Sequence, residues 1–156
     1  MEFPKIVSGG QTGADRAALD WALANDVGHG GWCPRGRLAE DGVIAEKYDL
    51  AETPDDNYSQ RTEWNVRDSD ATVIFSRAAR LRGGSLFTME MAALHDKPCL
   101  HLSGLQDAPE NARQLRDFLR RHRVRKLNVA GPRASGERTV GAMVHEIFDN
   151  LFVDWE

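Results

Sequence analysis

Short β-branched runs alternate with amphipathic segments along the whole chain, and this alternation constrains the fold more than any other feature. Ile6 and Val7 form the first run, which ends in a glycine-rich turn at 8–13. The apolar residues that follow have the spacing of one helix face; they are Ala14, Ala17, Ala18, Trp21 and Ala22. Further strands are predicted at 29–34, 70–76, 98–102 and 127–130, and further helices at about 56–66, 87–94, 107–122 and 140–151. We therefore expect an open parallel α/β sheet with helices on both faces, in three α/β/α layers.

Length and charge narrow the class of protein. The chain has 156 residues, the usual size of one domain, so we predict a single domain over residues 1–156. It carries 20 basic and 24 acidic residues, a formal net charge of −4. This balance argues against a nucleic-acid partner, because such proteins need a basic surface to displace counterions from phosphates. The net charge does not exclude a small anionic ligand, because one site can be positive on an acidic protein.

The sequence also predicts where the protein works. The residues after Met1 lack the basic start and apolar stretch of a signal peptide, and no apolar run is long enough to span a membrane. We expect a soluble cytoplasmic protein without a membrane partner. Cys33 and Cys99 belong to no metal or redox spacing, and we expect both to be buried as small hydrophobic residues.

Three glycine-containing loops follow three of the predicted strands. In an open α/β sheet such loops meet at the carboxyl edge, where ligands bind. Glycine lets the backbone approach an anion closely, and the N–H groups at the next helix start point toward it. Each loop alone is also compatible with an ordinary tight turn. Together they predict a phosphate pocket whose candidate binding residues are Gly9, Gly10, Gln11, Thr12, Gly13, Arg16, Gly83, Gly84, Ser85, Thr88, Gly131 and Arg133, with Arg77 as a further source of charge. The phosphate itself is expected over residues 10–13, at the start of the first helix, either there alone or shared with Gly84 and Ser85.

Several common sites are excluded. The first loop lacks the Lys-Ser/Thr of a P-loop, and it does not match the GxGxxG of nicotinamide dehydrogenases. We find no HExxH motif and no carboxylate cluster with metal-ligand spacing, so no protein-ligated metal is expected.

Four segments resemble a known family. They are Ser-Gly-Gly-Gln-Thr-Gly-Ala-Asp-Arg-Ala-Ala-Leu-Asp at 8–20, Gly-Gly-Trp-Cys-Pro at 30–34, Arg-Thr-Glu-Trp-Asn at 61–65 and Asn-Val-Ala-Gly-Pro-Arg at 128–133. Together they cover most of the chain and are similar to proteins of the molybdenum-carrier family, which resemble molybdenum cofactor carrier protein. The resemblance implies a Rossmann-like fold, homo-oligomers, and a superfamily that includes the LOG-type phosphoribohydrolases.

The LOG resemblance also implies a candidate catalytic pair. Those enzymes carry Arg-Lys-x-x-Met-x-x-x-Ala-Asp-Ala on a helix and strand, then Gly-Gly-x-Gly-Thr-x-x-Glu. Here Arg61 falls on the first arginine, residues 69–71 read Ser-Asp-Ala, and Glu90 falls on the acid of the glycine motif. By this resemblance Arg61 and Glu90 would cleave an N-glycosidic bond. The sequence departs from the motif at Thr62, Asn65, Leu86 and Phe87, with Thr88 one place late. Structural roles on helix surfaces are the alternative for both residues.

The combined expectation is a binding or carrier protein for a phosphorylated small molecule, either molybdenum cofactor or a nucleoside phosphate by resemblance. A LOG-like nucleotide N-ribosidase using Arg61 and Glu90 is the alternative function. A third hypothesis is a domain that senses a nucleotide-derived signal and acts through a partner protein.

Overall fold

The computed structural model describes residues 1–155. At its centre is a five-stranded sheet with the strand order β2-β1-β9-β7-β8. The strands are β1 (Lys5–Val7), β2 (His29–Gly30), β7 (Ala71–Ser76), β8 (Cys99–Ser103) and β9 (Lys126–Ala130). Every neighbouring pair in this sheet is parallel. The prediction of a parallel sheet is therefore confirmed.

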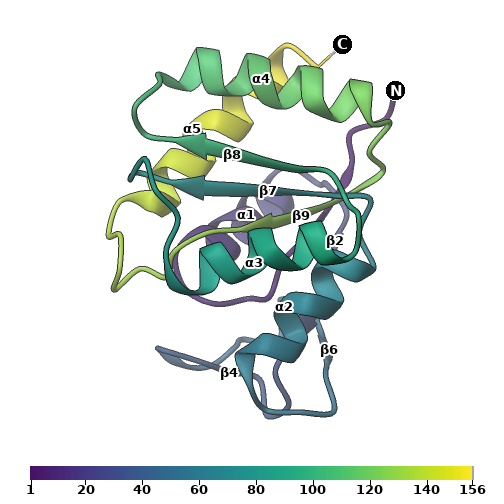
Figure 1. The fold of residues 1–156 in the computed structure, drawn as a ribbon, viewed down its shortest axis with the longest axis vertical. Helices are drawn as coiled ribbons and strands as arrows, with labels where there is room; N and C mark the ends of the chain where they lie inside the picture. The colour runs from purple at the N-terminus through teal and green to yellow at the C-terminus, as the bar shows by residue number, and fades with distance from the viewer. Residues whose placement is uncertain (156) are drawn as a thin grey trace.

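Helices cover both faces of this sheet and give the three-layer Rossmann-like fold that the sequence predicts. They are α1 (Ala14–Ala24), α2 (Tyr58–Arg67), α3 (Gly83–Leu94), α4 (Ala108–Arg121) and α5 (Val140–Val153). Figure 1 shows α2 and α3 in front of the sheet, with α1 and α5 behind it. Among residues 1–155, no helix is both long and apolar enough to cross a membrane.

The main core lies between the sheet and the layer of α1, α4 and α5. The Trp21 ring stacks on Phe148 with ring centroids 5.0 Å apart, and Phe75 of β7 lies 5.6 Å from Phe148. All six residues of β7 are buried, as expected for a central strand with helices on both faces. This core fixes the strand ends that carry the candidate site.

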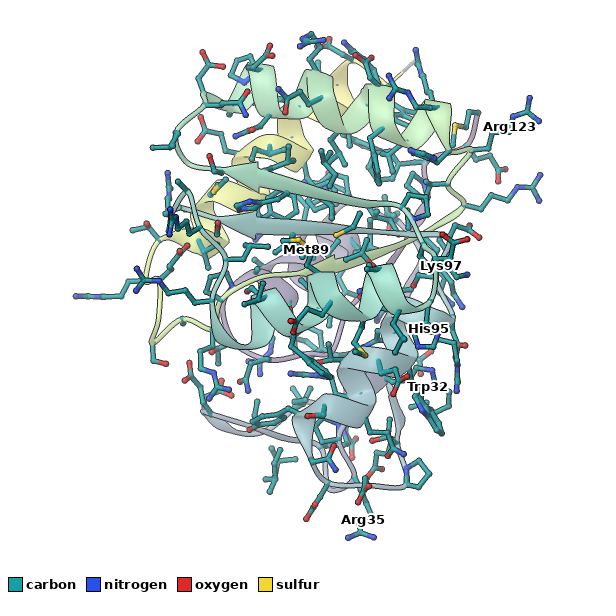
Figure 2. The ribbon with its side chains drawn as sticks, in the orientation of Figure 1. Trp32, Arg35, Met89, His95, Lys97 and Arg123 are labelled. Carbon is teal, nitrogen blue, oxygen red and sulfur yellow. The ribbon has the colours of Figure 1, made fainter. Side chains whose placement is uncertain are left out.

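The chain between β2 and α2 forms a smaller subdomain around a second apolar cluster. It contains a parallel pair, β3 (Trp32–Cys33) with β6 (Ala51–Glu52), and an antiparallel pair, β4 (Leu38–Ala39) with β5 (Gly42–Val43). Its cluster consists of Leu19, Cys33, Ala39, Ile44, Tyr48 and Leu50. The Arg37 guanidinium donates to four backbone carbonyls in this segment, which has few ladder hydrogen bonds of its own. Figure 2 shows Arg35 at this extremity and Arg123 at the other end of the molecule.

The structure differs from the sequence predictions in three details. The strand expected at 29–34 is two short strands, because Gly31 has a φ of 132° and bends the chain between them. The helical spacing from Ala112 onward predicts His122 on the inner stripe of α4, but His122 is exposed as its C-cap; the sequence also predicts Asp107 as the N-cap, and Asp107 does cap the start. Cys33 is buried, while Cys99 is only half-buried on the edge strand β8.

Candidate anion-binding cleft

A cleft of about 710 Å³ opens at the carboxyl ends of β1, β7 and β9. Its walls come from Gly9, Gln11 and Asp15, the inner face of α2, the β7–α3 loop with the first turns of α3, and the β9–α5 loop. This is the edge at which open α/β sheets bind ligands, and the volume is that of a small-molecule site. All three glycine-containing segments singled out in the sequence meet here.

The cleft brings together most of the predicted residues. Those that line it are Gly9, Gln11, Arg61, Gly83, Gly84, Ser85, Thr88, Gly131 and Arg133, with Arg77 beside them. Gly10, Thr12, Gly13, Arg16 and Glu90 are not among the residues that line it.

Protein contacts close the start of α1, where the phosphate was expected. The Thr12 hydroxyl donates to the Glu40 carboxylate and accepts from the Ala134 N–H at 3.1 Å. The Arg16 guanidinium forms a two-pronged pair with Asp41, at 2.9 and 3.1 Å. These side chains therefore tie the small subdomain to the main fold and face away from the cleft.

Close packing around Gly10 and Gly13 leaves no room for a side chain at either position. A Cβ at Gly10 would meet the side chains of Leu50 and Ile44, and one at Gly13 would lie 2.3 Å from the Pro132 carbonyl oxygen. The Ala14 N–H, at the start of α1, donates to that same carbonyl at 3.2 Å. The chain itself thus occupies the space over residues 10–13 in which an anion was expected.

The start of α3 is open instead. Residues 83–85, expected as a loop, form the first turn of this helix. Its N-cap, Arg82, makes no side-chain capping bond, and no acidic residue lies in the first turn. Gly83 and Gly84 are exposed, and no atom lies within 4 Å of a Cβ built on either. The first backbone N–H groups of a helix have no intrahelical partner and attract anions.

The cleft is positive although the protein is acidic. Five arginines line it, at positions 61, 77, 80, 82 and 133, against the two carboxylates of Asp15 and Glu137. The Glu137 carboxylate accepts from the backbone N–H groups of Arg77 at 2.5 Å and Ala78 at 3.2 Å, and so fixes the β7–α3 loop. Within residues 1–155, no side-chain hydrogen bond or ion pair engages the guanidinium of Arg80, Arg82 or Arg133. The Arg133 guanidinium does lie 5.3 Å from the ring centroid of Tyr58.

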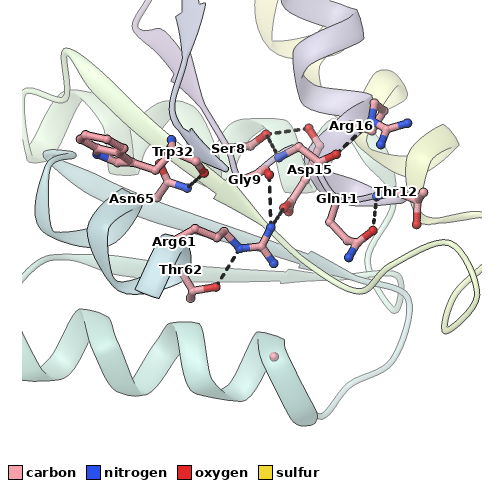
Figure 3. Close-up of polar contacts among 12 residues, drawn as sticks. Ser8, Gly9, Gln11, Thr12, Asp15, Arg16, Trp32, Arg61, Thr62 and Asn65 are labelled. Atoms are coloured by element: carbon pink, nitrogen blue, oxygen red, sulfur yellow. Dashed lines mark hydrogen bonds and ion pairs between the residues drawn. The ribbon is translucent and has the colours of Figure 1, made fainter. Parts of the chain in front are cut away.

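Asp15 and Arg61 form a buried ion pair on the wall of the cleft. The Asp15 carboxylate lies 3.8 Å from the Arg61 Nη1, which also donates to the Gly9 carbonyl at 3.2 Å (Figure 3). A Cβ at Gly9 would come within 2.5 Å of that Nη1, so the absence of a side chain gives the guanidinium its place.

Burial raises the pKa of Asp15 to about 6, although the Arg61 charge and the backbone N–H groups of Gln11 and Gly9 act in the opposite direction. Asp15 was not predicted as a site residue. In the sequence it reads as an ordinary acid in the first turn of a helix. Its position directly after the glycine-rich loop was the only signal for a role in the site.

Gln11 presents a buried donor without a partner. Its Oε1 accepts from the backbone N–H groups of Thr12 at 3.0 Å and Glu40 at 2.8 Å, and these two bonds fix the orientation of the amide. The side chain is buried, and its Nε2 has no hydrogen-bond partner in the described part of the chain. An unpaired buried amide costs free energy, so such groups point to a missing partner.

The structure does not bring Glu90 to Arg61. Thr88 faces the sheet and is buried, and Glu90, two residues further along α3, is exposed because residues two apart lie on different faces of a helix. The carboxylate beside Arg61 is that of Asp15. Within residues 1–155 no group of three or more His, Cys, Asp and Glu side chains is arranged to hold a metal ion.

The sheet order and the cleft at its carboxyl edge define a Rossmann-like α/β protein. The sequence profile of the circularly permutated YpsA SLOG family matches residues 6–152, and the chain belongs to this family. Among solved structures, it is similar to one from Syntrophus aciditrophicus SB named "Putative molybdenum carrier protein". The two share 43% sequence identity with a TM-score of 0.93, over 96% of this chain and 94% of the other. A comparison with curated proteins gave no match. The family expected from the four sequence segments is thus confirmed.

Proposed function

We propose that the protein binds a phosphorylated small molecule in this cleft and serves as its carrier. The observation that supports this most strongly is that Arg80, Arg82 and Arg133, all without ion-pair partners in the described chain, line the same cleft as the open start of α3. A planar guanidinium suits phosphate because it donates two parallel hydrogen bonds to its oxygens. The helix start adds backbone N–H donors and a favourable dipole.

The name of the Syntrophus relative supports molybdenum cofactor, a phosphorylated pterin, as the cargo. The chemistry of the cleft is compatible with it. Arginines suit the phosphate, the cleft is large enough for the ring system, and the lining offers amide, hydroxyl and carboxylate groups for a polar heterocycle. On this proposal the protein recognises the phosphate and the ring of the cargo. A nucleoside phosphate offers the same two features and is the other candidate ligand. Homo-oligomeric assembly and a cytoplasmic location stay predictions.

The N-ribosidase alternative has weaker support from the geometry. Stabilising positive charge on a sugar requires a carboxylate that faces it. Glu90 is exposed and outside the lining of the cleft, so it does not face a ligand bound there. We therefore favour binding over cleavage.

Isothermal titration calorimetry tests the proposal. The purified protein is titrated with ribose 5-phosphate, AMP, GMP and dihydroneopterin phosphate, and in parallel with ribose, adenosine, guanosine and dihydroneopterin. We expect at least one phosphorylated compound to bind with submillimolar affinity and its unphosphorylated counterpart to bind about tenfold more weakly or worse. Equal affinities within each pair, or no binding by any phosphorylated compound at millimolar concentration, would contradict it.

A further inference from the structure

We propose that Asp15 and Gln11 recognise one particular edge of the ligand's heterocycle: a carbonyl, a ring N–H and an exocyclic amino group in a row. Guanine and pterin share this edge, and adenine lacks it. The inference rests on the proposed function, because it concerns the heterocycle of the same ligand whose phosphate the arginines bind. Asp15 and Gln11 line the cleft and have no part in binding the phosphate.

Asp15 supplies the acceptors. An ionised carboxylate has about four lone-pair sites. The backbone N–H groups of Gly9 and Gln11 favour its ionised form, and the Arg61 Nη1 at 3.8 Å lies beyond hydrogen-bond distance. The carboxylate therefore keeps acceptor sites for a ligand. Its side chain is 11% exposed and belongs to the lining of the cleft.

Gln11 supplies the donor. Its Oε1 is engaged by two backbone N–H groups, so the amide cannot turn over without losing both bonds. Its Nε2 is therefore held as a donor, and it has no hydrogen-bond partner among residues 1–155. A ligand carbonyl would satisfy it. Figure 3 shows the Asp15 carboxylate between the Gln11 amide and the Arg61 guanidinium, so the donor and the acceptor come from adjacent side chains.

The two groups together select between heterocycles. The carbonyl of a guanine or pterin ring accepts from Gln11, while the ring N–H and the amino group donate to Asp15. Adenine offers one amino donor beside a ring nitrogen that is itself an acceptor. That nitrogen and the Asp15 carboxylate are both acceptors, so no hydrogen bond would join them. The Gln11 amide N–H would also stay without a partner. Sites with fixed polar groups reject ligands that leave those groups unpaired.

This assignment also orients the ligand. Gln11 belongs to the β1–α1 turn and Asp15 to the first turn of α1, whereas Arg80 and Arg82 belong to the separate wall that leads into α3. The ring therefore lies against the β1–α1 turn and the phosphate against α3.

The test compares GMP, IMP and AMP by isothermal titration calorimetry at about pH 7.5, where Asp15 is ionised. IMP keeps the carbonyl and ring N–H of GMP and lacks only the amino group. We expect GMP to bind about tenfold more tightly than IMP or AMP, and dihydroneopterin phosphate to bind at least as tightly as IMP. Tighter binding of dihydroneopterin phosphate than of GMP would identify a pterin as the heterocycle of the ligand. The reverse order would identify guanine.

Two variants test whether Gln11 and Asp15 cause the preference for GMP over IMP and AMP. Gln11→Glu keeps the acceptors for Thr12 and Glu40 and removes the donor, and Asp15→Asn removes the charge with little change in volume. Each should reduce the GMP preference to less than about threefold while ribose 5-phosphate binds as before. Asp41→Asn, which changes a carboxylate outside the cleft, should leave the preference intact.

Equal binding of GMP, IMP and AMP by the wild-type protein overturns the inference even if neither variant folds. If ribose 5-phosphate binds in that experiment, the proposed function survives and only the edge recognition fails. If no phosphorylated compound binds, both fail.

Discussion

The Asp15 carboxylate lies 3.8 Å from the Arg61 guanidinium, and both side chains are buried where the first helix meets α2. Neither residue is close to the other in the sequence. The pair joins the β1–α1 turn to α2, and through the Gly9 carbonyl the same guanidinium also holds the turn itself. This wall of the cleft is therefore held by one ion pair and one hydrogen bond that link segments far apart in the sequence.

The burial of Asp15 predicts a distinctive pH dependence of stability. Its pKa rises from 3.8 to about 6 on folding, so the folded state binds this proton more tightly than the unfolded state. The stability that protonation contributes is fully present below about pH 4 and is lost as the pH rises through about 6. Relative to Asp15→Asn, which cannot titrate, the wild-type protein should lose about 2–3 kcal/mol of unfolding free energy between about pH 4 and about pH 7.

Urea denaturation of both proteins across this pH range measures the difference. The charged and polar groups that face Asp15 are the guanidiniums of Arg61 and Arg16 and the backbone N–H groups of Gly9 and Gln11. Parallel pH profiles for the two proteins would show that the Asp15 pKa is not raised.

Two glycines of the cleft should respond oppositely to alanine. A Cβ at Gly131 would lie 2.4 Å from the Phe75 carbonyl oxygen and 2.6 Å from the Ala14 Cβ, so Gly131→Ala should cost about 1–3 kcal/mol of stability. Gly84 has open space around it and lies in the first turn of α3, so Gly84→Ala should be neutral or stabilise by up to about 1 kcal/mol. Thermal and urea unfolding check both; equal destabilisation by the two changes would contradict the assignment.

The start of α4 should depend on its capping side chain. The Asp107 carboxylate accepts from the Glu110 N–H at 2.9 Å, so Asp107→Ala should destabilise the protein by about 1 kcal/mol. Asp117→Ala removes another acid from the same helix, one whose exposed pair with Arg113 contributes little, and should change stability by less than about 0.5 kcal/mol. An Asp107→Ala variant as stable as Asp117→Ala would exclude a capping role.

Much of the fold could be predicted because each element carries a local signal. The buried β7 run, the apolar stripe of α1 and the Asp107 cap all follow from short-range patterns. The bend at Gly31 could not, because it depends on the Ser8 carbonyl oxygen, which would lie 2.2 Å from a Cβ there.

The site could be predicted only in outline. Glycines after strands placed the cleft at the correct edge. Which helix start was open depended on long-range contacts: Glu40 engages Thr12, Asp41 engages Arg16, and the β9–α5 loop covers Gly13. The acid beside Arg61 was likewise set by tertiary packing, since Asp15 is 46 positions away in the numbering of the chain.

The central claim is that the open start of α3 and its unpaired arginines hold the ligand's phosphate. The most direct measurement is the affinity of ribose 5-phosphate for Arg82→Ala and Arg133→Ala, compared with Arg123→Ala at the far end of the molecule (Figure 2). All three variants lose one positive charge, so a general charge effect would act on each. We predict that Arg82→Ala and Arg133→Ala each weaken binding about tenfold or more, because each removes a charge-assisted hydrogen bond, and that Arg123→Ala binds like wild type. Unchanged affinity in the two cleft variants, or the same loss in all three, would contradict the account.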